Sequence, residues 1–280
     1  MNVFNKIAGI ITARDMAQRP LGLVPTMGYL HAGHLALVQQ AMHENRTVVV
    51  SIFVNPTQFG PTEDLTTYPR DMERDLELLR EEGVQLVFAP SEEEMYPQGF
   101  ATYLDVQGVS AHLEGKRRPG HFNGVATVVT KLLTIVRPHR TYFGQKDGQQ
   151  AVVVKRLNQD LNLGSEIVVV PTVRAPDGLA LSSRNVYLTE EERHAAPVFY
   201  FSLSRVKELW QQGQQDAEIL RQELVRLIAT EPLVQLDYVS IADSSNLEEL
   251  AWVNRPAMVS LAARLGNTRL IDNIILGDTQ

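Results

Sequence analysis

The stretch Pro25-Thr26-Met27-Gly28-Tyr29-Leu30-His31-Ala32-Gly33-His34 decides how this chain folds. It follows the apolar run 21–24, which predicts a buried strand, and it precedes Leu35, Val38 and Met42, whose spacing predicts a helix. The stretch is therefore expected to be a tight turn from a strand into a helix N-terminus. Backbone N–H groups and the helix dipole favour a phosphate there. The two histidines and two glycines of the turn favour nucleotide binding, although two surface histidines on an ordinary loop would give the same letters.

The composition is that of a globular protein with one large domain or two smaller ones. The 280 residues are 44% hydrophobic and 21% charged, and the formal net charge is −7. That charge argues against nucleic acid as a partner, because a phosphate backbone requires positive patches. The chain has no cysteine, which excludes disulfides, thiol nucleophiles and cysteinyl thioesters. The apolar run 7–13 is short for a secretory signal and no run is long enough to span a membrane, so we expect no membrane partner and a cytoplasmic protein.

Strand and helix patterns alternate through the first part of the chain. The predicted strands, nearly all continuous apolar runs, are 21–26, 48–54, 84–89, 140–143 and 167–173. The predicted helices between them include 34–44, 71–82 and 122–136. This alternation predicts an α/β fold with a parallel sheet covered on both faces.

The pattern changes after about residue 176. A capping box formed by Thr189 and Glu192 predicts a helix that runs to about residue 212, and Asp216 caps a second helix. Three shorter strands are then predicted at 236–242, 257–265 and 268–276, the last two joined as a hairpin. The C-terminal part is therefore expected to be a small α+β domain.

Two polar loops follow predicted strands, at the sheet edge where open parallel sheets bind ligands. Asn55 and Gln58 follow the strand 48–54 and offer donors and acceptors for hydroxyl and carboxylate groups, although a plain polar turn fits equally. Lys146 follows the strand 140–143 and could reach a phosphate, with Gln150 one turn further on. A solvated Lys-Asp pair is the alternative there.

Two other segments offer groups that bind anions. Ser182, Ser183 and Arg184 place two hydroxyls and a guanidinium in succession at the domain junction, which suits a phosphate clamp or an ordinary linker. The basic cluster 116–118 precedes the helix that begins near His121, and it is either a solvated face or an anion site.

Five motifs occur in one order along the chain: P-T-M-G-x-L-H-x-G-H, V-N-P-x-Q-F, G-H-F-x-G-V, F-G-x-K-D-x-Q-Q and L-S-S-R-N. Together they resemble the pantoate–β-alanine ligase (pantothenate synthetase) family of the H-x-G-H nucleotidyltransferase superfamily, over almost the full chain. The resemblance implies a Rossmann-like domain over 1–176 that binds ATP and pantoate. It also implies a smaller C-terminal α+β lid domain over 177–280 that closes over the site, and a homodimer.

The resemblance implies an ATP-dependent condensation of (R)-pantoate with β-alanine through a pantoyl adenylate, which releases pyrophosphate and then AMP. ATP and Mg²⁺ are the implied cofactors. Mg²⁺ is expected mostly on phosphate oxygens and water, with Asp75 as a candidate outer ligand. Adenylation makes a carboxylate reactive without a protein nucleophile, so alignment and charge stabilisation suffice for catalysis.

The same resemblance implies the site residues. Those implied to contact the ATP phosphates are His31, His34, Lys146, Ser182, Ser183 and Arg184. Among them His31, His34, Lys146 and Arg184 are the implied catalytic residues, with His34 the proton donor. The rest of the implied nucleotide pocket is Met27, Gly28, Tyr29, Leu30, Ala32, Gly33, Gly144, Gln145, Asp147, Val173 and Leu181. Gln58 and Gln150 are implied to bind pantoate, and Gln58 also β-alanine.

One position departs from the family pattern, because Gly148 stands where the family usually has an aromatic residue. Two other functions remain open at this point: another nucleotidyl-transferring enzyme of the same fold, such as one that makes a dinucleotide, and a nucleotide sensor without catalysis. Gln58 and Gln150 favour a small polar acid as substrate. A sensor would not need two histidines, a lysine and an arginine around the phosphates.

Overall fold

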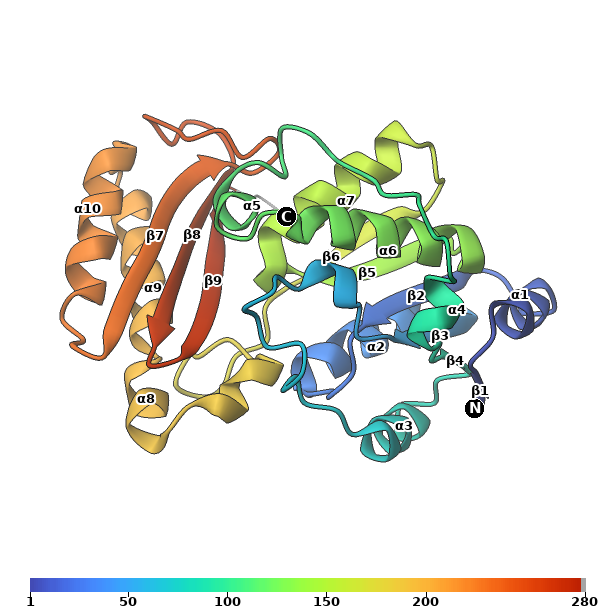
Figure 1. Cartoon of the computed structure of the whole chain (residues 1–280). Coiled ribbons are helices and arrows are strands. Elements are labelled where there is room, and N and C mark those ends of the chain that lie inside the picture. The colour runs from blue at the N-terminus through green and yellow to red at the C-terminus, as the bar shows by residue number, and fades with distance from the viewer. Residues whose placement is uncertain (278–280) are drawn as a thin grey trace. The chain divides into compact units, whose positions relative to one another are not determined.

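A computed structural model of the chain describes residues 1–277 (Figure 1). The chain divides into two compact units: the first unit comprises Met1–Gln145 and Val153–Pro171, and the second unit comprises Lys146–Val152 and Thr172–Gln280. The last three residues of the predicted domain 177–280 lie outside the described residues. The division predicted from the sequence, after residue 176, stays a prediction.

The first unit is built on a six-stranded parallel sheet with the order β1-β4-β3-β2-β5-β6. Its strands are β1 Asn2–Phe4, β2 Leu21–Thr26, β3 Thr47–Ile52, β4 Leu86–Phe88, β5 Arg140–Gly144 and β6 Glu166–Val170. All six residues of β3 are buried, as expected of a central parallel strand whose two faces are both covered. The predicted parallel sheet is thereby confirmed, and the short edge strand β1 is an addition that the sequence did not reveal.

Helices cover both faces of this sheet. The helices of this part of the chain are α1 Ile7–Asp15, α2 Ala32–Glu44, α3 Met72–Glu81, α4 Glu92–Met95, α5 Leu113–Arg117, α6 His121–Val136 and α7 Gly148–Asp160. The first residues of α7 belong to the second unit. Val38 of α2 and Leu79 of α3 pack with Val24 and Val50 in one core cluster. Residues adjacent to these in the strands point to the opposite face, where α6 packs on β2 and on α1.

The second unit is built on an antiparallel sheet with the order β7-β8-β9. Its strands are β7 Val234–Asp243, β8 Ala257–Leu265 and β9 Thr268–Leu276, and its helices are α8 Glu190–Ala195, α9 Val198–Gln211 and α10 Ala217–Ile228. Phe199, Leu220 and Val259 lie in one core cluster, which joins α9, α10 and the sheet. The predicted hairpin is confirmed, since Leu265 pairs with Thr268 across its turn.

One predicted helix of the second unit is wrong in its extent. The capping box at Thr189 and Glu192 is present, but the helix ends at Ala195, and a separate helix begins at Val198. Pro197 lies between the two and lacks the N–H that a continuous helix would use there. Within residues 1–277, no helix is both long and apolar enough to cross a membrane.

Candidate active site

The turn from β2 into α2 places the two histidines against each other. His31 is the N-cap of α2, and its Nδ1 accepts a hydrogen bond from the Gly33 amide at 3.1 Å. The Nδ1 of His34 accepts from the His31 amide at 3.3 Å, and the two ring centroids lie 4.1 Å apart. A neutral imidazole that accepts at Nδ1 carries its proton on Nε2. Each ring therefore keeps an Nε2–H donor at a helix N-terminus, where an anion is favoured.

The turn itself passes through left-handed backbone at two consecutive residues, Gly28 with φ +84° and Tyr29 with φ 51°. A Cβ on Gly28 would lie 3.1 Å from Asp75 Oδ2 and 3.1 Å from Ile52 Cγ2. Glycine is therefore required there by conformation and by space. Tyr29 adopts a conformation that costs a non-glycine residue about 1 kcal/mol or more, so other contacts must hold it.

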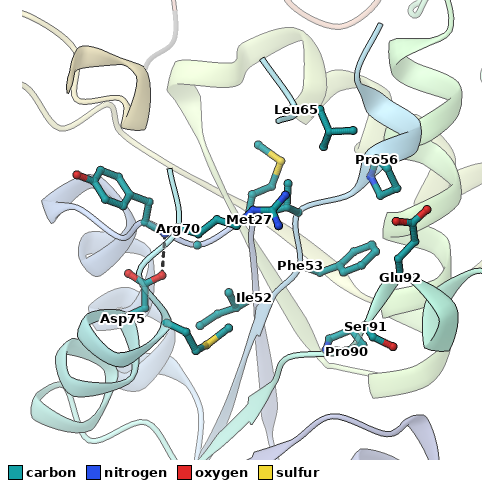
Figure 2. A pocket seen from close by; sticks show the side chains of 14 residues that line it. Met27, Ile52, Phe53, Pro56, Leu65, Arg70, Asp75, Pro90, Ser91 and Glu92 are labelled. Carbon is teal, nitrogen blue, oxygen red and sulfur yellow. Dashed lines mark hydrogen bonds between the residues drawn. The ribbon is translucent and has the colours of Figure 1, made fainter. Parts of the chain in front are cut away.

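Asp75, on α3, holds the turn in this conformation. Its side chain, labelled in Figure 2, is 1% exposed. Its two oxygens accept hydrogen bonds from the Tyr29 and Leu30 amides, both at 2.7 Å. Arg74 adds a bond from its Nη1 to the Leu30 carbonyl at 2.9 Å. Burial raises the pKa of Asp75, and the two amide bonds oppose that rise. A role for Asp75 near Mg²⁺ stays a prediction, whereas its bonds to the turn give it a positioning role that the sequence did not suggest.

We expect Asp75→Ala to weaken both the fold and the turn that carries His31 and His34. The change removes two charge-assisted hydrogen bonds and frees Tyr29 to leave its strained conformation, so the free energy of unfolding should fall by roughly 2–4 kcal/mol. The kcat of the remaining folded protein should fall at least about tenfold, because misplaced donors stabilise a transition state poorly. Urea unfolding and steady-state kinetics measure the two effects. Glu73→Ala, an exposed change on the same helix, is the control and should alter neither.

Gln58 lies beside the histidine turn, at the end of the 3₁₀ helix Pro56–Gln58 that follows β3. Its Nε2 donates to Met27 Sδ at 3.0 Å, and its Oε1 accepts from Asn55 Nδ2 at 3.2 Å. Asn55 is 1% exposed and accepts from Tyr96 OH at 2.8 Å. The structure thus brings Gln58 together with the residues 27–34, as the predicted site requires. Asn55 is the buried support that fixes the orientation of the Gln58 amide.

The helix α6 packs directly on the backbone of this 3₁₀ helix. A Cβ on Gly124 would lie 2.4 Å from the Thr57 carbonyl oxygen, so only glycine permits the approach. Asn55 Nδ2 uses the same closeness to donate to the Gly124 carbonyl at 3.1 Å. The glycine in the motif G-H-F-x-G-V therefore serves to place Gln58.

A partly buried histidine supports Gln58 from the other side. His121 Nδ1 donates to the Gln58 carbonyl at 2.8 Å, and Arg118 Nη1 lies 3.1 Å from His121 Nε2. Arg118 in turn donates to both carboxylate oxygens of Glu63, from Nε at 2.6 Å and from Nη2 at 2.7 Å. Burial, and secondarily the charge of Arg118, lowers the pKa of His121 to about 4. Arg118 is half-buried in this network, so it is not part of a solvated face, and the anion-site interpretation of the basic cluster 116–118 stays a prediction.

We expect His121 to make the stability of the protein depend on pH. Its pKa is about 4 in the folded chain and about 6.5 when unfolded, so between these values the unfolded chain binds an extra proton. The free energy of unfolding should therefore rise with pH across that window, by roughly 3 kcal/mol in total, and level off above pH 6.5. Urea unfolding at several pH values measures the free energy of unfolding, which should rise less steeply with pH in His121→Gln than in the parent. An equal dependence of the free energy of unfolding on pH in both proteins would contradict the assignment. His43→Ala, at the exposed end of α2, is the control.

Lys146 and its neighbours begin the second unit. Lys146 Nζ lies 3.2 Å from Asp147 Oδ1 with the lysine side chain 20% exposed, and the Lys146 carbonyl accepts from Asn273 Nδ2 at 2.9 Å. The backbone at Lys146 is thus tied to β9. Gly148, the position that departs from the family pattern, is the buried first residue of α7, and Gln150 follows in the same helical turn.

The serine-arginine segment of the second unit has a defined local structure. Ser182 is the N-cap of the 3₁₀ helix Ser183–Tyr187, and its Oγ accepts from the Arg184 amide at 3.3 Å. The Leu181 amide bonds to the Val173 carbonyl at 3.0 Å, which holds these two predicted pocket residues together. Arg174 lies between these two residues in the sequence, and its two Nη atoms donate to the two carboxylate oxygens of Asp272 at 2.6 and 2.9 Å. This ion pair ties the segment to β9.

The predicted site residues therefore fall into two groups, each ordered within its own unit. The first unit holds residues 27–34, Gln58, Gly144 at the end of β5, and Gln145. The second unit holds Lys146, Asp147, Gln150, Val173, Leu181, Ser182, Ser183 and Arg184. Within the described part of the chain, no three histidine or acidic side chains converge to hold a metal ion.

A parallel sheet whose second strand leads through capping histidines into a helix defines a Rossmann-like α/β protein with an H-x-G-H turn. The sequence profile of the family described as pantoate-beta-alanine ligase matches residues 2–275. The pantothenate synthetase of Roseiflexus sp. (strain RS-1) is 58% identical over 276 residues, which are 99% of this chain and 99% of that protein. The chain therefore belongs to the pantoate–β-alanine ligase family, a family of enzymes, as the five motifs predicted.

Solved structures agree with this assignment. The crystal structure of pantothenate synthetase from Thermus thermophilus superposes with a TM-score of 0.94 at 49% identity, covering 98% of this chain and 99% of that one. The pantoate–β-alanine ligase from Francisella tularensis, crystallised as a complex with β-γ ATP and β-alanine, has a TM-score of 0.81 at 37% identity. That match covers 98% of this chain and 97% of the Francisella chain.

Proposed function

We propose that this chain joins pantoate to β-alanine to form pantothenate, with ATP consumed through a pantoyl adenylate. The family supports the overall ligase activity, and the Francisella relative was crystallised with β-γ ATP and β-alanine. The observation that supports adenylate chemistry best is the pair of Nε2–H donors at the start of α2. Two donors at a helix N-terminus suit a phosphate on which negative charge develops.

The first step forms a bond between a pantoate carboxylate oxygen and the α-phosphorus of ATP, and it breaks the bond to pyrophosphate. His34 and His31 donate to the phosphate oxygens as their charge grows, and Lys146 and Arg184 balance the charge of the departing pyrophosphate. In the second step the β-alanine nitrogen attacks the acyl carbon. The bond to the AMP oxygen breaks, and AMP leaves with that electron pair.

Gln58 is the proposed contact for pantoate and β-alanine, and Gln150 a second contact for pantoate. The Met27 thioether is a weak acceptor, so the Gln58 amide loses little when it donates instead to a substrate hydroxyl or carboxylate. Ser182, Ser183 and Arg184 are proposed to close over the phosphates as part of a lid domain over 177–280, next to a nucleotide domain over 1–176. Closure of this kind protects a reactive adenylate from water.

Three further properties belong to the same proposal. Mg²⁺ accompanies ATP and neutralises its phosphates, the protein forms a homodimer, and it works in the cytoplasm. Size-exclusion chromatography with light scattering tests the dimer directly.

A rapid-quench experiment with labelled ATP tests the proposed reaction. Enzyme with ATP, Mg²⁺ and pantoate, but without β-alanine, should release at most about one pyrophosphate per site, and later addition of β-alanine should give pantothenate and AMP. ADP and phosphate would indicate an acyl phosphate instead. Pyrophosphate that forms only with β-alanine present would exclude a stable adenylate. A dinucleotide product, or no turnover at all, would favour the nucleotidyl-transferring enzyme or the sensor.

A further inference from the structure

The first unit contains a pocket of about 380 Å³ beside the histidine turn (Figure 2). Met27, Gly28 and Tyr29 form one wall, and apolar side chains that include Phe53 and Leu65 form much of the rest. Neither histidine nor Gln58 lines it, but Met27 does, and Gln58 Nε2 contacts the Met27 sulfur at 3.0 Å. The pocket therefore adjoins the proposed pantoate contact without being part of it, and the reaction described so far leaves it without an occupant.

Arg70 supplies the positive charge of this pocket. Its side chain is exposed, and within residues 1–277 no hydrogen bond or ion pair engages its guanidinium. Asp75 also lines the pocket, but both of its oxygens accept bonds from the turn, and Glu92 is the second acidic residue of the lining. A guanidinium pairs well with a carboxylate or a phosphate, because either group matches its two parallel donors.

The charges of the pocket distinguish among the three substrates. A triphosphate with several negative charges would meet Glu92 and Asp75 as well as Arg70, and like charges repel. Pantoate must direct its carboxylate to phosphorus, and that group becomes an uncharged acyl carbon. β-Alanine alone keeps its carboxylate unchanged through both steps, while its other end must reach an acyl carbon near Gln58 and Met27.

We propose that this pocket binds β-alanine, with the Arg70 guanidinium holding its carboxylate and its amine directed toward Met27. The inference rests on the proposed function and adds the site of the second substrate. Two methylene groups separate the ends of β-alanine, so its nitrogen approaches the adenylate while its carboxylate stays on Arg70. The nitrogen forms the new bond to carbon, AMP leaves with the electron pair of the broken C–O bond, and the displaced proton passes to water.

The test is Arg70→Met, which keeps the apolar stem and removes the charge. The KM for β-alanine should rise roughly 10- to 100-fold, the effect of losing a hydrogen bond between charged groups. Single-turnover pyrophosphate release from ATP and pantoate, with no β-alanine present, should keep its parental rate. Arg70→Lys should give an intermediate KM, and Arg80→Met, an exposed change on the neighbouring helix α3, should leave every constant unaltered.

A neutral analogue makes the assignment specific to the carboxylate. The parent enzyme should use 3-aminopropanamide far less well than β-alanine, whereas Arg70→Met should use the two about equally. An unchanged KM for β-alanine in both Arg70 variants would overturn the proposal. A higher KM for ATP, or slower pyrophosphate release, would also overturn it by assigning Arg70 to the first step. If the parent enzyme itself released no pyrophosphate, the proposed function would fail instead, and the two failures are thereby distinguished.

Discussion

Replacing His34 with alanine is expected to lower kcat by roughly 10²–10³-fold, the usual effect of removing one preorganised donor from a developing anion. The loss is expected in kcat more than in the KM for ATP, because the proposed bond from Nε2–H to the phosphate would strengthen as negative charge develops there. His34 also accepts the His31 amide through Nδ1, so the variant loses one capping bond. That loss should cost about 1 kcal/mol of stability, too little to unfold the domain.

The measurement is a pair of rates, single-turnover pyrophosphate release and steady-state formation of AMP, each on protein whose folding is verified by circular dichroism. His43→Ala is the matched control, because it removes an imidazole from the exposed end of the same helix. Turnover within about threefold of the parent in folded His34→Ala would remove His34 from the chemistry. Slower pyrophosphate release, with normal conversion of a supplied adenylate to AMP, would restrict the role of His34 to the first step.

The sequence predicted those features that depend on contiguous residues. Continuous β-branched runs such as 48–54 indicated buried parallel strands, because both faces of such a strand are covered. The turn that contains His31 and His34 was recognisable because a buried strand precedes it and helical spacing follows it. The capping box at Thr189 lies within four residues, and it too was found in the structure.

Features that depend on distant residues were not predictable in this way. Asp75 lies 46 positions from Tyr29 in the sequence, and nothing local indicates that its carboxylate holds the histidine turn. Arg118 pairs with Glu63 across 55 positions, so a basic cluster suggested a solvated face or an anion site instead of support for Gln58. Pro197 is different, because its missing N–H was a local signal for the break between α8 and α9.

Lys146 of the second unit is expected to affect the reaction rate as strongly as His34. Lys146→Met should slow pyrophosphate release roughly 10²–10³-fold, because the variant keeps the side-chain length but loses the charge proposed to balance the leaving pyrophosphate. The fold should survive, since the tie from Asn273 reaches the Lys146 backbone carbonyl and not its side chain.

Two measurements separate charge balance from a structural effect of the lysine. The Nζ–Asp147 pair has a partly exposed partner, and exposed ion pairs contribute at most about 1 kcal/mol, so urea unfolding of Lys146→Met should differ little from that of the parent. Lys155→Met, on the exposed face of the same helix α7, should release pyrophosphate at the parental rate. A large stability loss in Lys146→Met, or equal slowing in both variants, would contradict a role at the phosphates. Slow pyrophosphate release with unchanged unfolding would place the ammonium at the leaving group, because only the chemical step then depends on the charge.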